Sequence, residues 1–263
     1  MNFGHPEPTW LHPLAKLIPE SVLPYGEFVV ITVLVALILI GTFALLARRL
    51  STRDVSGGQA FSEVVVSGFV GFVESVLGPH SERLVPLIGT LFLFILTMNL
   101  FGLIPGMLSP TASMNTTVAL ALIVFFRVQY EGIRSHGFLA YVRHFAGEPT
   151  GIHWIFDVFL GVFMFPLHLI GELAKPLSLC LRLAGNIFAE DSVIFIFGTL
   201  SPVLYLFLKH SPWAKEVPFF PLQILILPLM ILFGVIQALV FSLLASIYIA
   251  VMVGESHEEA PAH

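Results

Sequence analysis

Residues 217–254 read VPFFPLQILILPLMILFGVIQALVFSLLASIYIAVMVG, an uncharged run of 38 residues. Because an α-helix rises 1.5 Å per residue, a single helix of this length would measure about 57 Å. The hydrocarbon core of a bilayer is only about 30 Å thick. The run therefore predicts a membrane helix that is either strongly tilted or broken near Pro221 and Pro228, and we favour the strong tilt.

The rest of the chain has the same apolar character. Of its 263 residues, 57% are hydrophobic and 11% are charged, and the mean hydropathy is +0.93. Ordinary soluble domains carry about 25% charged residues. The net charge of -5 is small for this length, which argues against a nucleic-acid-binding protein and against a strongly basic membrane-surface protein. The composition predicts an all-α integral membrane protein.

The apolar segments predict about five membrane-embedded helices in a single membrane domain over residues 28–253. Phe28 to Ala47 supplies 20 uncharged residues, the length that one crossing requires. The expected membrane segments are about 28–47, 84–107, 116–133, 154–190 and 217–253. Residues 59–78 mix Glu63 and Glu74 with apolar side chains, which is typical of an amphipathic helix lying in the membrane interface.

Positive charges predict the orientation of the chain. Arg48, Arg49 and Arg53 follow the first span at once, and cytoplasmic flanks are enriched in Lys and Arg. We therefore expect an external N-terminal segment (residues 1–27) and a cytoplasmic tail (residues 254–263). Neither a signal-peptide cleavage pattern nor an Arg/Ser-rich transit sequence is recognisable, so we expect a bacterial plasma-membrane protein that retains its first span.

The single cysteine, Cys180, lies inside an apolar segment. One cysteine forms neither an internal disulfide nor a thiolate zinc site. We expect no metal and no cofactor.

A stripe of polar side chains follows one face of the 154–190 segment. Residues spaced three and four apart lie on the same side of a helix. The stripe consists of Glu172, Lys175, Ser178 or Leu179, Arg182, Asn186 and Glu190. So many polar groups do not face lipid, and we expect this face to contact protein or water.

Arg182 is the central residue of the stripe. An arginine near mid-membrane costs from about 3 to more than 10 kcal/mol, depending on the scale, so it needs a partner or a function. Glu172 and Glu190 are ten and eight residues away, beyond the reach of a pair along the same helix. A structural ion pair with a carboxylate from another helix remains the alternative to a functional role.

Gln237 is the most informative polar residue of the last segment. A carboxamide in hydrocarbon needs hydrogen-bond partners, and two long neighbouring helices would bring it to the Arg182 face. Ser242 and Ser246 are typical of close helix packing.

Residues 175–186, KPLSLCLRLAGN, resemble the signature K-P-x-S-L-x-L-R-L-x-G-N of ATP synthase subunit a. Two further segments agree with that family, NLFGLIP at 99–105 and PTASMNTT at 110–117. Gln237 followed by Tyr248 resembles the family's final helix. The resemblance covers roughly residues 28–253.

The resemblance implies that the chain is the proton-conducting stator subunit of a bacterial F-type ATP synthase. Its last two long helices would form a strongly tilted hairpin against a rotating ring of c subunits. Other implied partners are b-type peripheral stalk subunits, the remainder of the synthase and the lipid bilayer. The chain would be non-catalytic and would bind no nucleotide or nucleic acid, and the sequence contains no G-x-x-x-x-G-K-[ST] loop.

The resemblance also implies roles for individual residues. Arg182 would be the essential charge that faces the c-ring carboxylates. The other implied positions are Asn186, Glu190, Asp191 and Gln237 in an outer half-channel, His168 and Glu172 in an inner half-channel, and Ser178, Lys175 and Tyr248 in support.

The sequence departs from the family pattern at two positions. Met230 stands where some bacterial members have a histidine, and His168 stands where several members have an acid. The group that releases protons on the inner side is therefore open. Only one of the neighbours Glu190 and Asp191 points along the Arg182 face, and their order is open as well.

A secondary transporter and a structural membrane scaffold are the two alternative functions. An ion-coupled secondary transporter with a midplane site often has inverted repeats, and the two halves of this chain show no convincing similarity. A structural membrane scaffold would tolerate neutralisation of its intramembrane charges. The choice of proton over sodium as the coupling ion is our default expectation.

Overall fold

The computed structural model describes residues 26–49, 57–77, 83–104, 107, 109–137, 141, 154–209 and 221–258. The predicted external segment up to residue 25, the predicted tail from residue 259 and the flanking Arg53 lie outside the described residues.

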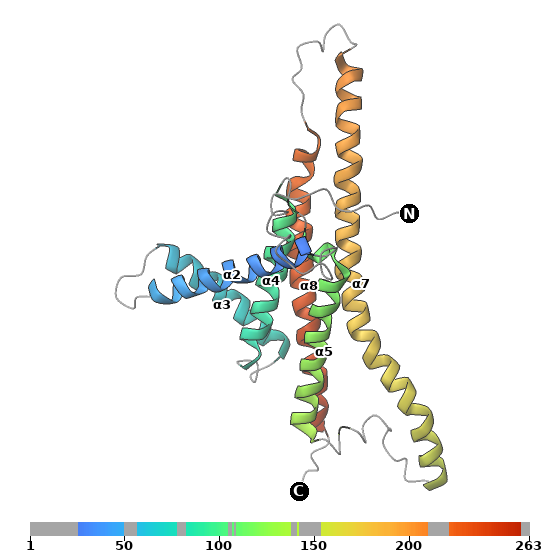
Figure 1. The fold of residues 1–263 in the computed structure, drawn as a ribbon. Helices are drawn as coiled ribbons and strands as arrows, with labels where there is room; N and C mark the ends of the chain where they lie inside the picture. The colour runs from blue at the N-terminus through green and yellow to red at the C-terminus, as the bar shows by residue number, and fades with distance from the viewer. Residues whose placement is uncertain are drawn as a thin grey trace. The chain divides into compact units, whose positions relative to one another are not determined.

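The described residues form six α-helices and one 3-10 helix, with no strand among them (Figure 1). They are α2 (Gly26–Arg49), α3 (Gly57–Leu77), α4 (Val85–Gly102), η3 (Pro110–Ala112), α5 (Met114–His136), α7 (Trp154–Lys209) and α8 (Gln223–Glu258). Five of them, all except α3 and η3, are long and apolar enough to cross a membrane. The prediction of an all-α membrane protein with five membrane helices is confirmed. The interfacial position of α3 stays a prediction.

The two longest helices differ in part from the expected pattern. α7 has 56 residues and continues past residue 190 to Lys209, because the residues between Asp191 and Lys209 are uncharged and mostly apolar. At 1.5 Å per residue, 56 residues correspond to a length of about 84 Å along the helix axis. α8 runs through Pro228 without interruption, so the alternative of a break at this proline is wrong. A proline removes one backbone hydrogen bond, which a membrane helix tolerates when neighbouring groups compensate.

The chain divides into two compact units. The first unit contains residues 1–49, 92–116 and 183–239, and the second contains residues 50–91, 117–182 and 240–263. α4, α5, α7 and α8 each contribute one part to each unit.

The first unit is built on an antiparallel hairpin of α7 and α8. Between the last part of α7 and the residues just before α8, the backbone N–H of Leu222 donates to Oγ of Ser201 over 2.8 Å. Deeper along the helices, the side chain of Asn186 donates to that of Gln237. α2 contacts η3 in the same unit. The prediction that the last two long helices are neighbours therefore holds within this unit.

In the second unit, α5 runs antiparallel to the first part of α7. Thr117 and Cys180 lie 3.5 Å apart at one end of this contact, and Gln129 reaches Glu172 toward the other. The last part of α8 lies along α5 as well (Figure 1). At Gly132 an added Cβ would lie only 2.8 Å from Cγ of Met252, so the glycine permits the close approach of the two helices.

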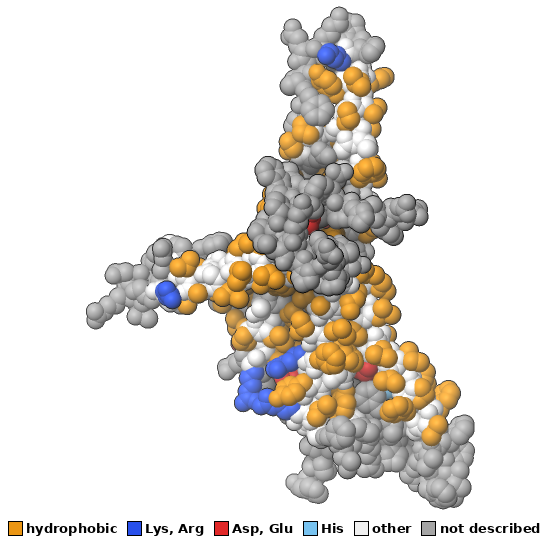
Figure 2. All heavy atoms as spheres, in the orientation of Figure 1, with side chains coloured by type: hydrophobic (Ala, Val, Ile, Leu, Met, Phe, Trp, Pro, Cys, Tyr) orange, Lys and Arg blue, Asp and Glu red, His pale blue; other side chains and the backbone are white. Residues whose placement is uncertain are grey.

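On the face drawn in Figure 2, most of the visible described side chains are hydrophobic. Large apolar residues of every membrane helix are exposed, among them Ile40, Phe126, Phe195 and Leu225. Apolar area of this extent marks a surface that lipid or partner proteins cover.

Candidate functional site

Arg182 lies on α7 with its side chain exposed. On the adjacent face of the helix, Leu179 and Leu183 are each buried within their own unit. The exposed Arg182 therefore lies away from the buried side of α7. Within the described part of the chain, Arg182 forms no ion pair and no hydrogen bond. An internal structural ion pair, the alternative that the sequence left open, therefore has no support in the described residues.

Asn186 and Gln237 form the centre of the site in the first unit. Asn186 follows Arg182 by one helical turn on α7, and its Nδ2 donates to Oε1 of Gln237 on α8. The Gln237 side chain is buried, with 3% of its surface exposed. Its Nε2 is also buried and has no hydrogen-bond partner among the described residues. An amide donor buried in this way favours an acceptor such as water or an oxygen of a partner protein.

The two neighbouring acids of α7 differ in exposure. Glu190 is half-buried and lies one turn beyond Asn186, whereas Asp191 is exposed. Neither carboxylate forms an ion pair with a described residue. Met230, which stands where some family members have a histidine, is 5% exposed on α8. Because methionine does not titrate, this position supplies no proton-accepting side chain.

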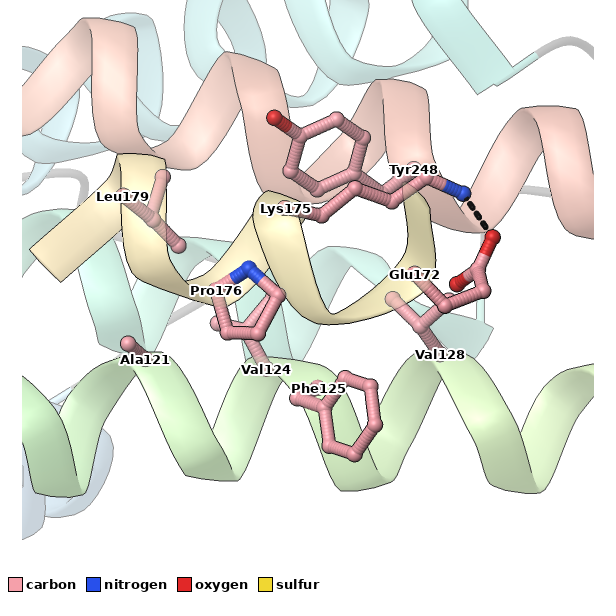
Figure 3. A pocket seen from close by; sticks show the side chains of 9 residues that line it. All are labelled: Ala121, Val124, Phe125, Val128, Glu172, Lys175, Pro176, Leu179 and Tyr248. Carbon is pink, nitrogen blue, oxygen red and sulfur yellow. Dashed lines mark hydrogen bonds and ion pairs between the residues drawn. The ribbon is translucent and has the colours of Figure 1, made fainter. Parts of the chain in front are cut away.

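A polar cluster occupies the second unit, around a small pocket between α5, α7 and α8 (Figure 3). Lys175 forms an ion pair with Oε1 of Glu172, one turn earlier on α7. Nε2 of Gln129 on α5 donates to Oε2 of the same carboxylate over 3.2 Å. Nζ of Lys175 also lies 5.8 Å from the centre of the Tyr248 ring, a cation–π distance. Both oxygens of Glu172 are thus held by donors that cannot accept a proton.

The remaining predicted residues lie outside this cluster. His168 is exposed and precedes Glu172 by one helical turn. Ser178 is exposed on α7. Neither residue is among the nine that line the pocket.

Two members of this region were missed by sequence reasoning. Gln129 fell close to the expected end of its span, although a carboxamide in an apolar helix is the same signal that identified Gln237. Tyr141 follows α5 and is buried, and no local pattern distinguished it. Burial, together with the negative charge of Glu172, raises the pKa of Tyr141 to about 12.

No group of three or more His, Cys, Asp or Glu side chains among the described residues is arranged to hold a metal ion. The polar groups instead form two sets, one on α7 and α8 in the first unit and one on α5, α7 and α8 in the second.

The chain matches one family model and is similar in sequence to several known proteins. A family model described as "ATP synthase A chain" matches residues 29–250. The chain is 40% identical over 241 residues to ATP synthase subunit a 1 of Syntrophotalea carbinolica, covering 90% of this chain and 91% of that protein. It is 40% identical over 214 residues to ATP synthase subunit a of Geobacter sulfurreducens, with 81% and 82% covered. The subunit a of Moorella thermoacetica is 38% identical over 228 residues, with 87% and 91% covered.

Proposed function

This chain belongs to the ATP synthase A chain family, and from that premise we propose that Arg182 is the fixed charge against which the rotor carboxylates of an F-type synthase turn. Family membership makes the chain a non-catalytic proton-channel subunit of the complex and a multi-pass membrane protein. The role of the arginine and the two half-channels are our proposal.

Arg182 has no ion-pair partner among the described residues, and this observation carries the proposal. A guanidinium without a carboxylate in a membrane helix is unfavourable, so its exposure favours a carboxylate supplied by another subunit. Arginine keeps its proton at every attainable pH and therefore does not relay protons. It attracts each passing carboxylate and favours the ionised form, which drives the release of the proton before the carboxylate passes.

On the outer side, protons approach the rotor along Asn186, Gln237, Glu190 and Asp191. The Asn186–Gln237 bond supports this role because it links two carboxamides across the hairpin of α7 and α8 in the first unit. The buried Nε2 of Gln237 has no hydrogen-bond partner among the described residues and can donate a hydrogen bond to a water molecule. The half-buried Glu190 is the more protected of the two acids, and Asp191 is the more accessible.

On the inner side, protons leave past His168 and Glu172. Lys175 pairs with the Glu172 carboxylate and lies over the Tyr248 ring, and Ser178 continues the polar face of α7 toward Arg182. His168 is exposed and lies one helical turn before Glu172, so its imidazole is accessible to a departing proton.

Because the two half-channels are separated by Arg182, a proton crosses only when a rotor carboxylate carries it around. Each charge that crosses 100 mV releases about 2.3 kcal/mol, so several protons are needed for each ATP made elsewhere in the complex. The partners are a ring of c subunits, a b-type peripheral stalk and the remaining synthase subunits. We place the chain in a bacterial plasma membrane with its N-terminus outside and its C-terminus in the cytoplasm, following the arginines after the first span.

The decisive experiment replaces Arg182 in inverted membrane vesicles. Arg182→Ala should abolish ATP synthesis and ATP-driven proton pumping while the subunit still assembles with its partners. Arg134→Ala, at an exposed arginine near the end of α5, is the matched control and should retain both activities. ATP synthesis by the Arg182→Ala vesicles would overturn the proposal. Isolation of the chain as a monomer that carries a solute would favour a transporter instead.

A further inference from the structure

A buried polar network joins the segment after α4 to α8 in the first unit. Nδ2 of Asn99, on the last turn of α4, donates to the backbone oxygen of Gly234 over 3.3 Å. Oγ1 of Thr111, in η3, donates to Oδ1 of Asn99 over 2.9 Å. Asn99 and Thr111 are 6% and 0% exposed, so both bonds are shielded from water.

Thr111 determines which way the Asn99 carboxamide points. Its hydroxyl occupies Oδ1 of Asn99, which leaves the amide hydrogens of Asn99 for the carbonyl of Gly234. Thr111 is held in turn by Ser109, whose Oγ lies 2.7 Å from its hydroxyl. Oγ of Ser109 also lies 3.4 Å from the backbone oxygen of Met98. The turn after α4 is therefore folded back onto the asparagine that it orients.

Gly234 makes this contact with α8 possible. A Cβ added there would lie 3.3 Å from Cβ of Asn99, tighter than ordinary contact. The carbonyl of Gly234 also serves the hydrogen-bond ladder of its own helix, and its second lone pair is free for a side-chain donor. The glycine thus lets a side chain of α4 bond directly to the backbone of α8.

The contact lies one turn away from the proposed outer half-channel. Gln237 follows Gly234 by three residues and bonds to Asn186 on α7. Because each residue turns a helix by about 100°, a small rotation or shift of α8 would move Gln237 away from Asn186. The bond at Gly234 holds the backbone of α8 against α4, one helical turn before Gln237.

We propose that Asn99 is a positioning residue for proton entry, because its bond to Gly234 holds α8 in the rotation that aligns Gln237 with Asn186. This inference rests on the proposed function, since it concerns the efficiency of the outer half-channel. Asn99 acts through Gln237 and has no contact with the proton path of its own.

The test measures ATP synthesis in inverted vesicles, whose lumen corresponds to the outer side of the membrane. The lumenal proton concentration is varied at a fixed membrane potential and a fixed external pH. Asn99→Leu, which keeps a similar volume, should raise the proton concentration for half-maximal synthesis by about fivefold, the effect expected from one lost bond between membrane helices. The maximal rate per assembled complex should stay close to that of the unmodified protein.

Two further variants change the other residues of this hydrogen-bond network. Gly234→Ala adds the crowded Cβ, and Thr111→Val removes the hydroxyl that orients Asn99, and both should shift the half-maximal concentration in the same direction. They keep the inference testable if Asn99→Leu does not assemble. Thr97→Val is the control, because Thr97 lies on the same helix and, among the described residues, its hydroxyl bonds to the oxygen of Leu93 in its own helix. It should leave the half-maximal concentration unchanged.

A purely structural role would lower the amount of assembled complex or its maximal rate without moving the half-maximal proton concentration, and that result would overturn the inference. An unchanged concentration in assembled Asn99→Leu, Gly234→Ala or Thr111→Val vesicles would overturn it as well. Arg182→Ala vesicles, measured in parallel, separate the two proposals. If they are inactive while the Asn99 variants behave normally, only the positioning role fails.

Discussion

Asn186 on α7 donates a hydrogen bond to the side-chain oxygen of Gln237 on α8, across a sequence separation of 51 residues. Bonds of this kind between membrane helices contribute only about 0.6 to 1.7 kcal/mol. Its energy is thus a small part of what holds the hairpin together. Its direction matters more, because it aligns two carboxamides that we assign to the outer half-channel.

Gln237→Leu should therefore reduce ATP-driven proton pumping much more than it reduces assembly. We expect about a tenfold lower pumping rate per assembled complex, equivalent to about 1.4 kcal/mol. Ser246→Ala is the control, since Ser246 is equally buried on α8 and bonds to the Ser242 backbone of its own helix. Pumping by Gln237→Leu at the rate of this control would contradict the proposed outer half-channel.

Arg182→Lys should fail almost as completely as Arg182→Ala. Lysine keeps the positive charge but replaces a planar, forked donor with a point charge that loses its proton more readily in an apolar setting. The prediction is loss of ATP synthesis in vesicles that contain normal amounts of the subunit. Synthesis by the lysine variant at an undiminished rate would show that charge alone is sufficient.

Single substitutions in the Glu172–Lys175 pair should lower the stability of the complex, and the double substitution should restore most of it. Glu172→Gln or Lys175→Met leaves one half-buried charge without its partner, and we expect either change to destabilise the purified complex by about 1–3 kcal/mol. The double variant removes both charges and should recover most of that loss. Thermal denaturation of the three variants measures the effect, and additive losses would contradict it.

Proton pumping by the double variant then answers the question of the inner proton group. If Glu172 passes protons, the double variant assembles but does not pump. If His168 passes them, the double variant pumps and His168→Ala does not.

Tyr141 should stay neutral far into the alkaline range. Its pKa is raised to about 12 by burial and by the charge of Glu172. Because the folded-state pKa lies above the ordinary value of 10.0, this group favours the folded state fully below pH 10 and loses that contribution as the pH rises toward 12. The phenolate absorbance difference between the unmodified protein and Tyr141→Phe measures the titration. Glu172→Gln should lower the pKa of Tyr141 only in part, since burial is the larger cause, and a midpoint near 10 in the unmodified protein would contradict the assignment.

The sequence predicted those features that the bilayer dictates. Apolar segments long enough to cross the bilayer identified the five membrane helices, and a charge in hydrocarbon singled out Arg182. The far end of α7 at Lys209 was not predictable, because apolar residues after Asp191 suit a continuing helix and a separate one equally well. Gln129 and Tyr141 were missed since their roles depend on which helix packs against α5. The bond from Asn99 to Gly234 joins residues 135 positions apart, and no local pattern encodes it.

The burial of Cys180 has a practical consequence. The chain's one native thiol is 5% exposed and lies against Thr117, so water-soluble alkylating reagents should leave it unmodified. Cysteines engineered at exposed positions such as Asn186 or Asp191 would then be the only reactive thiols of the subunit. Site-directed labelling can begin from the natural sequence, without first constructing a cysteine-free parent.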